Sequence, residues 1–150
     1  MVAPAYQIER RLPDELCIRL SGELDEATLL ACESDARGRL RLAKPGSLRM
    51  LWDLLEVTGY TLEARSVLAH LQGFLAEKAD RTVYVARHSQ ARSLSLWAVH
   101  MAGARQARIA DDLEHALGWL RGSGEPDTAV RPLVSVRPPA AVDPYDKTAS

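Results

Sequence analysis

The sequence predicts an α/β fold, a mixed β-sheet with packed helices in the element order β-β-α-β-α-β-α-β-α. Three observations lead to this prediction. Two segments of alternating apolar and polar residues, separated by a proline–aspartate turn, open the chain. Apolar stripes at helical spacing then alternate with short strand-like runs. Such alternation is typical of parallel strands joined by right-handed helical crossovers, so a hairpin followed by these units predicts a mixed sheet.

The opening hairpin and the first helix are predicted from alternation and capping. Apolar and polar side chains alternate over residues 6–9 and again over residues 16–21, on either side of a turn at Pro13. Asp25 can accept hydrogen bonds from the free amides of a following turn, so we expect a first helix from about residue 26 to 42. The apolar positions of this helix are Leu29, Cys32, Ala36 and Leu40.

The next unit has a central strand and a second helix. Residues 48–55 are almost continuously apolar, which is typical of a strand covered on both faces of the sheet. Thr58 and Gly59 then mark a loop. A second helix follows, because apolar residues recur at helical period on one stripe, formed by Leu62, Val67, Leu68, Leu71 and Leu75.

Two more strand–helix units complete the predicted domain. Residues 82–86 are rich in strand-forming types, and Ser89 can cap the helix that follows. A weaker strand is expected at residues 105–109, and the spacing of Asp111 and Glu114 favours a capping box at the start of the last helix. The expected apolar faces of these two helices are Leu94, Trp97 and Met101, and Leu113, Leu117 and Leu120. All three tryptophans fall on apolar stripes, so we expect them in the core.

The composition changes after the last predicted helix. Five prolines fall between residues 126 and 144, among only scattered aliphatic residues. Proline removes backbone donors and resists helix formation. We therefore expect one domain over residues 1–121 and a largely disordered tail over residues 122–150, with residues 133–136 as the exception.

Bulk properties restrict the classes of function. The 150 residues are 47% hydrophobic and 26% charged, and this length can bury about two-thirds of the unfolded surface in one core. The net charge of −1 provides no long-range field toward nucleic acid or an anionic membrane. No apolar window approaches the length of a membrane span, and the first residues do not resemble a signal peptide. We expect a cytoplasmic protein without nucleic-acid or membrane partners.

The sequence contains no recognisable catalytic constellation. No two histidines have the spacing of a helical metal site, the glycines form no phosphate-binding loop, and no serine lies in a G-x-S-x-G elbow. Cys17 and Cys32 lie in apolar contexts and are expected to be buried free thiols. Five arginines between residues 81 and 108 form either a solvated face or a contact for phosphate or an acidic partner. We therefore expect no enzyme activity, no cofactor and no metal.

The predicted loop at residues 56–61 is the most informative segment. It follows the central strand, and open α/β sheets place functional surfaces beyond the carboxyl ends of their strands. The segment is either such a surface or a generic turn.

Several motifs resemble those of a known family. Residues 20–25 are L-S-G-E-L-D, followed by Ala27 and Thr28, and this stretch resembles the LSGELDxAT signature of STAS domains. Residues 53–58 are similar to the DLSxVT central strand and loop of that family, and residues 111–120 to its closing helix. The group includes bacterial anti-sigma-factor antagonists, and the resemblance is to its SpoIIAA-like branch.

The resemblance implies a non-catalytic regulatory module that binds a protein such as an anti-sigma factor or a kinase-like protein. In the family, D-S-S-G opens the second helix and its second serine is phosphorylated. The matching stretch here is Thr61–Ala64, which has no serine and places Glu63 at the acceptor position. Glu63 either imitates the phosphorylated state or is an ordinary first-turn residue, and Asp25 is either a partner contact or only an N-cap. The expected partner-binding residues are Asp25, Thr58, Gly59, Tyr60, Thr61 and Glu63.

A different function remains open at this point. STAS-like sheets in some relatives are thought to hold nucleotides or apolar molecules, and Leu54, Leu55 and Tyr60 near the loop could line such a site. The sequence does not identify the partner, the oligomeric state or the role of the tail, and it does not decide whether Thr58 or Thr61 is phosphorylated.

Overall fold

The computed structural model describes residues 5–102 and 106–122, so the predicted tail lies outside the described residues except for Gly122. Strands and helices follow one another in the predicted order, which confirms the fold class. The elements are β1 (Tyr6–Leu12), β2 (Glu15–Leu24), α1 (Glu26–Leu40), β3 (Leu48–Tyr60), α2 (Leu62–Lys78), β4 (Ala79–Val85), α3 (Ser89–Ala102), β5 (Ala107–Ala110) and α4 (Leu113–Leu120).

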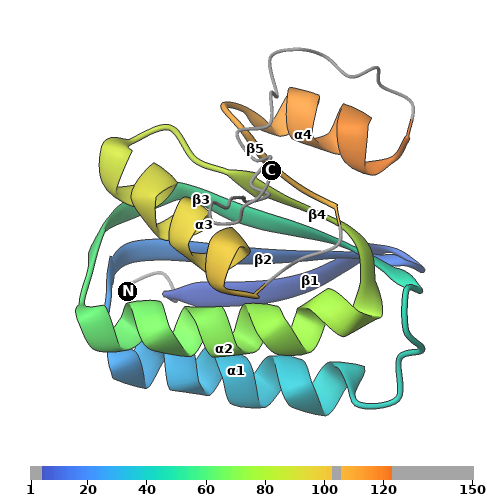
Figure 1. Cartoon of the computed structure of the whole chain (residues 1–150), viewed down its shortest axis with the longest axis horizontal. Helices are drawn as coiled ribbons and strands as arrows, with labels where there is room; N and C mark the ends of the chain where they lie inside the picture. The colour runs from blue at the N-terminus through green and yellow to red at the C-terminus, as the bar shows by residue number, and fades with distance from the viewer. Residues whose placement is uncertain (1–4, 103–105, 123–150) are drawn as a thin grey trace, which may run out of the picture.

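The strands form one mixed sheet in the order β1-β2-β3-β4-β5 (Figure 1). β1 runs antiparallel to β2, and each later pair of neighbours is parallel. β3 lies at the centre and is the longest strand, with 13 residues. Because β2 to β5 are parallel, their carboxyl ends all lie at the same end of the sheet.

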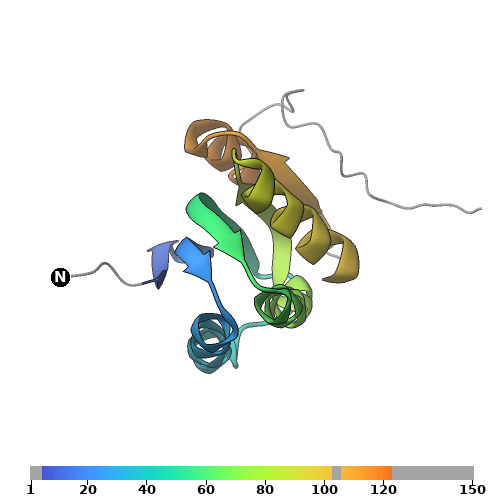
Figure 2. The ribbon, with the colours of Figure 1, turned by 90° about the vertical axis from the view of Figure 1, so that its left-hand side faces the viewer.

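Helices cover the two faces unequally. In Figure 2, α1 and α2 lie side by side on one side of the sheet, and α4 lies on the other. Successive side chains of a strand point to opposite faces of the sheet. Leu16 and Ile18 of β2 therefore pack in a large cluster with α1, α2 and α3, whereas Cys17 packs in a smaller cluster with α4. The larger cluster is the main core of the domain.

An aromatic pair lies at the centre of the main core. Trp52 of β3 stacks on Tyr84 of β4, with ring centroids 5.4 Å apart and planes within 3° of parallel. Both side chains are fully buried. The Tyr84 hydroxyl donates a 2.7 Å hydrogen bond to Oε1 of Gln72 on α2, which is also buried. The stack therefore ties the two central strands to α2.

Helix α4 is anchored to the sheet by ionic and aromatic contacts. The Arg121 guanidinium, at the end of α4, donates two hydrogen bonds of 2.8 and 2.9 Å to the buried carboxylate of Glu15 on β2. Arg81 donates to the backbone carbonyl of Trp119, and the guanidinium groups of Arg81 and Arg108 lie over the Trp119 ring. Two of the five arginines between residues 81 and 108 thus pack at α4, and Arg105 lies outside the described residues.

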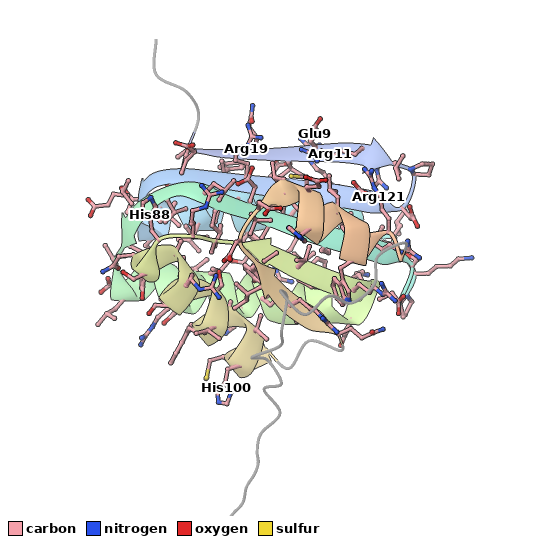
Figure 3. The ribbon with its side chains drawn as sticks, turned by 90° about the horizontal axis from the view of Figure 1, so that it is seen from above. Glu9, Arg11, Arg19, His88, His100 and Arg121 are labelled. Atoms are coloured by element: carbon pink, nitrogen blue, oxygen red, sulfur yellow. The ribbon has the colours of Figure 1, made fainter. Side chains whose placement is uncertain are left out.

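Charged side chains cover the part of this face that α4 does not reach. Figure 3 labels Glu9 and Arg11 on β1, which form an ion pair at 3.6 Å, and Arg19 on β2. Arg19 donates a 3.1 Å hydrogen bond to the buried carboxylate of Asp53 on β3. Among the described residues, this side of β1 and β2 is therefore closed by ion pairs and carries no further helix.

The predicted cap of α4 is wrong by one residue. Asp112, not Asp111, is the N-cap, and its Oδ1 accepts a 2.8 Å hydrogen bond from the His115 amide. Asp111 does not cap the helix, because its carboxylate instead accepts a 2.7 Å hydrogen bond from Nη1 of Arg92. Ser89, expected as a cap, is the first residue of α3.

Some residues expected in the core are exposed. Leu62 is 65% exposed and Met101 is 55% exposed, and Trp97 is only partly buried. Leu62 is the first residue of α2 and lies off the stripe that faces the sheet, which contains Ala64, Val67, Leu68, Leu71 and Leu75. Trp52 and Trp119 are buried as predicted.

Both cysteines are buried free thiols, as predicted. Burial raises the pKa of Cys17 to about 11 and that of Cys32 to about 12. Because the thiolate is the reactive form, we expect both residues to resist alkylation at neutral pH in the folded protein and to react fully after unfolding. Mass spectrometry after iodoacetamide treatment, with and without denaturant, measures this. Rapid labelling of the native protein at either cysteine would contradict the packing described here.

Candidate functional site

The carboxyl ends of β2 and β3 bring two helix starts together. Leu24 at the end of β2 pairs with Tyr60 at the end of β3. The Thr61 amide continues this pairing, donating a 3.1 Å hydrogen bond to the Leu24 carbonyl. Since α1 begins at Glu26 and α2 at Leu62, the N-termini of both helices lie at this end of the sheet.

Each helix start is closed by a side-chain cap. Oδ1 of Asp25 accepts a 2.9 Å hydrogen bond from the Thr28 amide, and Oγ1 of Thr61 accepts a 3.1 Å hydrogen bond from the Ala64 amide. Both caps satisfy an amide that has no partner inside its own helix. Asp25 and Thr61 are exposed, so capping does not remove them from the surface.

The expected loop after the central strand does not exist in the predicted form. Thr58, Gly59 and Tyr60 are the last residues of β3, not a loop. The ladder between β2 and β3 has irregularities near Ser21 and after Gly22, and these let both strands continue together to Leu24 and Tyr60. Gly22 has a φ of 78°, a conformation that glycine adopts without strain.

The six predicted partner-binding residues thus lie together, but they differ in exposure. Thr58 and Glu63 are exposed, like the two caps. Gly59 is buried, and a side chain at this position would meet the Glu23 carboxylate at 2.9 Å. Tyr60 is half-buried and packs against the main core. Gly59 and Tyr60 therefore lie beneath the surface and support it, and the groups that a partner could contact belong to the other four residues.

The structure adds acidic and apolar neighbours that sequence reasoning missed. The two segments that form this end, residues 21–26 and 56–63, contain five acidic residues and no lysine or arginine. All five are exposed: Glu23, Asp25, Glu26, Glu56 and Glu63. Leu62 lies between the Thr61 cap and Glu63, and its side chain is largely exposed. We call the exposed groups Glu23, Asp25, Glu26, Thr58, Thr61, Leu62 and Glu63 the N-cap surface.

The acidic residues at the start of α1 can be recognised in the sequence, but the segment that lies beside them in the fold cannot. Residues 23–26 are E-L-D-E, which marks an acidic helix start by itself. Only the parallel pairing of β2 with β3 places this run beside Thr61 and Glu63. Leu62 was expected on the buried stripe of the second helix, because a leucine has the same letter whether it faces the core or the solvent.

The cap of α1 makes stability depend on pH. Hydrogen bonds from the backbone amide and side chain of Thr28 lower the pKa of Asp25 in the folded state. The stabilisation is therefore complete above the usual value of about 4 and is lost as the pH falls through the lowered folded-state pKa. Asp25→Asn keeps a capping oxygen but does not titrate. We expect wild type to be more stable than this variant at neutral pH and the difference to shrink in acid, measured by urea unfolding at both pH values. An unchanged difference in acid would contradict this account.

The described residues contain no group of three His, Cys, Asp or Glu side chains that could hold a metal ion. All four histidines are exposed and lie apart along the chain, at positions 70, 88, 100 and 115. Within the same residues, no helix is long and apolar enough to cross a membrane.

Comparisons with known proteins identify the fold. One similar solved structure is an uncharacterized DUF3478-family protein with a SpoIIAA-like fold from Shewanella loihica PV-4. The TM-score is 0.62 at 20% sequence identity, covering 77% of this chain and 92% of that chain. The chain has a SpoIIAA-like fold. Another similar structure is the unphosphorylated anti-sigma factor antagonist SpoIIAA, with a TM-score of 0.59 at 18% identity, covering 79% of this chain and 99% of that chain. No family model and no curated protein matches the sequence.

The SpoIIAA-like fold confirms what the STAS resemblance implied about architecture. Both likenesses extend over most of this chain and nearly all of the other protein. At this level of identity the likeness concerns the fold alone, so the roles of Asp25 and of residues 58–63 stay predictions.

Proposed function

We propose that this chain is a non-catalytic regulatory module that binds a partner protein through the N-cap surface. The observation that carries the proposal is the meeting of two capped helix starts at one end of the sheet, where four carboxylates (Glu23, Asp25, Glu26 and Glu63) and the Leu62 side chain are exposed. An exposed apolar side chain on a surface that also carries charged groups is typical of a protein-binding site. The partner expected from this chemistry has a basic rim around an apolar pocket.

The fold supports a partner of a particular class. SpoIIAA, whose fold this chain shares, is an anti-sigma factor antagonist. We infer by analogy that the partner is an anti-sigma factor or a related kinase-like protein. Control by serine phosphorylation at the start of α2 is not part of the proposal, because the chain has threonine, leucine and glutamate at residues 61–63.

Co-purification followed by affinity measurement tests this proposal. Leu62→Ala should weaken binding of the recovered partner by about tenfold or more, since a central apolar anchor contributes at least about 1–2 kcal/mol. Combined Glu26→Gln and Glu63→Gln should slow association and reduce its dependence on salt. None of these substitutions removes a cap.

Matched controls lie at the opposite ends of the same two helices. Leu42 is 84% exposed just beyond the end of α1, and Glu77 is exposed in the last turn of α2. Leu42→Ala and Glu77→Gln should leave the affinity unchanged. Equal losses from the control and test variants, or no loss from Leu62→Ala, would refute the N-cap surface as the binding site.

The alternative of a small-ligand carrier gains no support from the residues suggested for it. Leu54 is fully buried in the main core, whereas Leu55 packs on the opposite face with α4. The two side chains cannot line one pocket, so the ligand-binding alternative stays a prediction without a site.

A further inference from the structure

Strand β1 is the open edge of the sheet. It pairs with β2 on one side, and Figures 1 and 2 show no described element beyond it on the other. Tyr6 to Arg10 pair with β2 in one regular register, and the irregularity of the strand begins only after Arg10. Within the described part of the chain, these five residues therefore form a straight, unpaired edge.

The register shows which backbone groups are free along this edge. The Ser21 amide donates a 2.9 Å hydrogen bond to the Ala5 carbonyl, so these two residues form a hydrogen-bonded pair. In an antiparallel ladder such pairs alternate, which directs the backbone groups of Gln7 and Glu9 toward β2. The amides and carbonyls of Tyr6, Ile8 and Arg10 must then point outward, away from β2.

We propose that the chain forms a two-fold symmetric dimer in which β1 pairs antiparallel with β1 of a second copy, with Ile8 opposite Ile8. In this register Tyr6 lies opposite Arg10 of the other copy. All three outward-facing residues then fall in hydrogen-bonded pairs, so every free amide and carbonyl of Tyr6, Ile8 and Arg10 gains a partner. The two sheets become one continuous sheet across the dimer.

The side chains are complementary in this register. Tyr6 and Ile8 share the face of the sheet that carries the main core, where Ile8 would meet its own copy as an apolar cross-strand pair. Arg10 would lie against Tyr6 of the other copy, as a cation beside an aromatic ring. On the opposite face Gln7 would lie beside Glu9. No like charges stand opposite each other.

Neighbouring registers are less favourable. Moving the two-fold axis to residue 9 places Glu9 opposite Glu9, and moving it to residue 10 places Arg10 opposite Arg10. Both shifts also leave more outward backbone groups unpaired. Charged residues often protect an edge strand from pairing, but in the register centred on Ile8 no charge of β1 stands opposite a like charge, because Glu9 faces Gln7 and Arg10 faces Tyr6.

The flank of β1 provides room for the second copy. A shallow groove of about 680 Å³ runs between β1 and α1, lined by Tyr6, Ile8, Asp35 and Arg39 among others. The Tyr6 hydroxyl donates a 3.3 Å hydrogen bond to Asp35, which is also paired with Arg39 at 2.7 Å. Across the two-fold axis, Arg10 of the other copy would enter this groove and approach the Tyr6–Asp35 pair. The lining contains two carboxylates, Glu9 and Asp35, against one guanidinium, Arg39, so its charge favours the arginine that a second copy of this chain would bring.

Sedimentation of the full chain from micromolar to millimolar concentration tests the dimer. The expected mass rises toward twice the 16.5 kDa of one chain. Arg10→Glu should raise the dimer dissociation constant by about tenfold or more, because it introduces a carboxylate near Asp35 at two symmetric contacts. Lys44→Glu, an exposed charge reversal in the loop after α1, should leave the dissociation constant unchanged.

Ile8→Pro tests the free edge independently. The Ile8 amide points outward, so proline there removes a donor to the second copy but no bond to β2. The variant should be folded by circular dichroism and monomeric. If the Ile8→Pro variant does not fold, the dimer dissociation constant of the Arg10→Glu variant is the test of the proposal. A folded wild-type chain that stays monomeric at millimolar concentration, or a dimer that both substitutions leave intact, would overturn the proposal.

Cross-linking tests the register itself. In a Cys17→Ala background, mixing Gln7→Cys with Glu9→Cys chains should give a disulfide-linked dimer on oxidation. Residues opposite each other without ladder bonds between them have Cα atoms about 4.5 Å apart, which suits a disulfide. Mixing Gln7→Cys with Arg11→Cys should give little product. Preferential cross-linking of the second mixture would mean a register centred on Glu9 and would contradict the proposal.

Discussion

Trp52→Ala should lower the free energy of unfolding by about 3–5 kcal/mol, the usual cost of deleting a large buried aromatic side chain. Trp52 is completely buried and stacks on Tyr84 between the two central strands. This loss is a large fraction of the stability of a domain of this size, since totals of about 5–15 kcal/mol are typical. Urea unfolding followed by circular dichroism measures the change.

Trp52→Phe is the matched control. The Trp52 indole N–H has no hydrogen-bond partner among the described residues, so phenylalanine keeps an aromatic ring and loses no hydrogen bond. Tyr84→Phe should cost more than its small size suggests, about 1–3 kcal/mol, because it leaves the buried Gln72 amide without its partner. A loss below about 1 kcal/mol for Trp52→Ala would contradict the central position of this stack.

The second large effect is expected at the anchor of α4. Arg121→Ala should lower the free energy of unfolding by about 2–3 kcal/mol, because it leaves the Glu15 carboxylate buried and unpaired. This value is below the usual cost of breaking a buried ion pair, since the Arg121 side chain is 42% exposed and water can enter its place.

A double substitution separates the buried charge from the lost contact. Adding Glu15→Gln to Arg121→Ala removes the uncompensated carboxylate and should restore part of the lost stability. If Glu15→Gln instead adds a further full loss, the buried charge is not the cause and the account of this anchor is wrong.

The alternation of side chains along the chain was sufficient to predict the fold class. Leu16, Ile18 and Leu20 mark one face of β2, and Val67, Leu68 and Leu71 mark the buried stripe of α2. These patterns depend only on the spacing of residues along the chain, so they can be recognised in a single sequence. The STAS-like motif at residues 20–25 added the expectation of a particular architecture, which the SpoIIAA-like fold confirms.

Features that depend on distant pairs could not be predicted. The end of β3 was expected as a loop because Thr58 and Gly59 are turn-forming types, and only the irregular pairing with β2 extends the strand to Tyr60. The Glu15–Arg121 contact joins residues 106 positions apart. The spacing to Glu114 favoured Asp111 as the cap of the last helix, whereas Asp111 is bound by Arg92 and Asp112 is the N-cap.

The same distinction applies to the candidate site. Asp25 and Thr61 were both expected to bind a partner from the family resemblance, and the hydrogen bond from the Thr61 amide to the Leu24 carbonyl brings their segments together. The exposure of Leu62 and of the carboxylates at this end of the sheet depends on which way each side chain faces. That information is absent from a single sequence.

Hydrogen exchange with and without the co-purified partner tests the central claim most directly. The first-turn amides of α1 and α2, over residues 26–30 and 62–66, should exchange more slowly in the complex, because the partner covers the N-cap surface. The amides of α4, on the opposite face of the sheet, should be unchanged. Protection confined to α3 or α4, with no change at the starts of α1 and α2, would contradict the proposed binding surface.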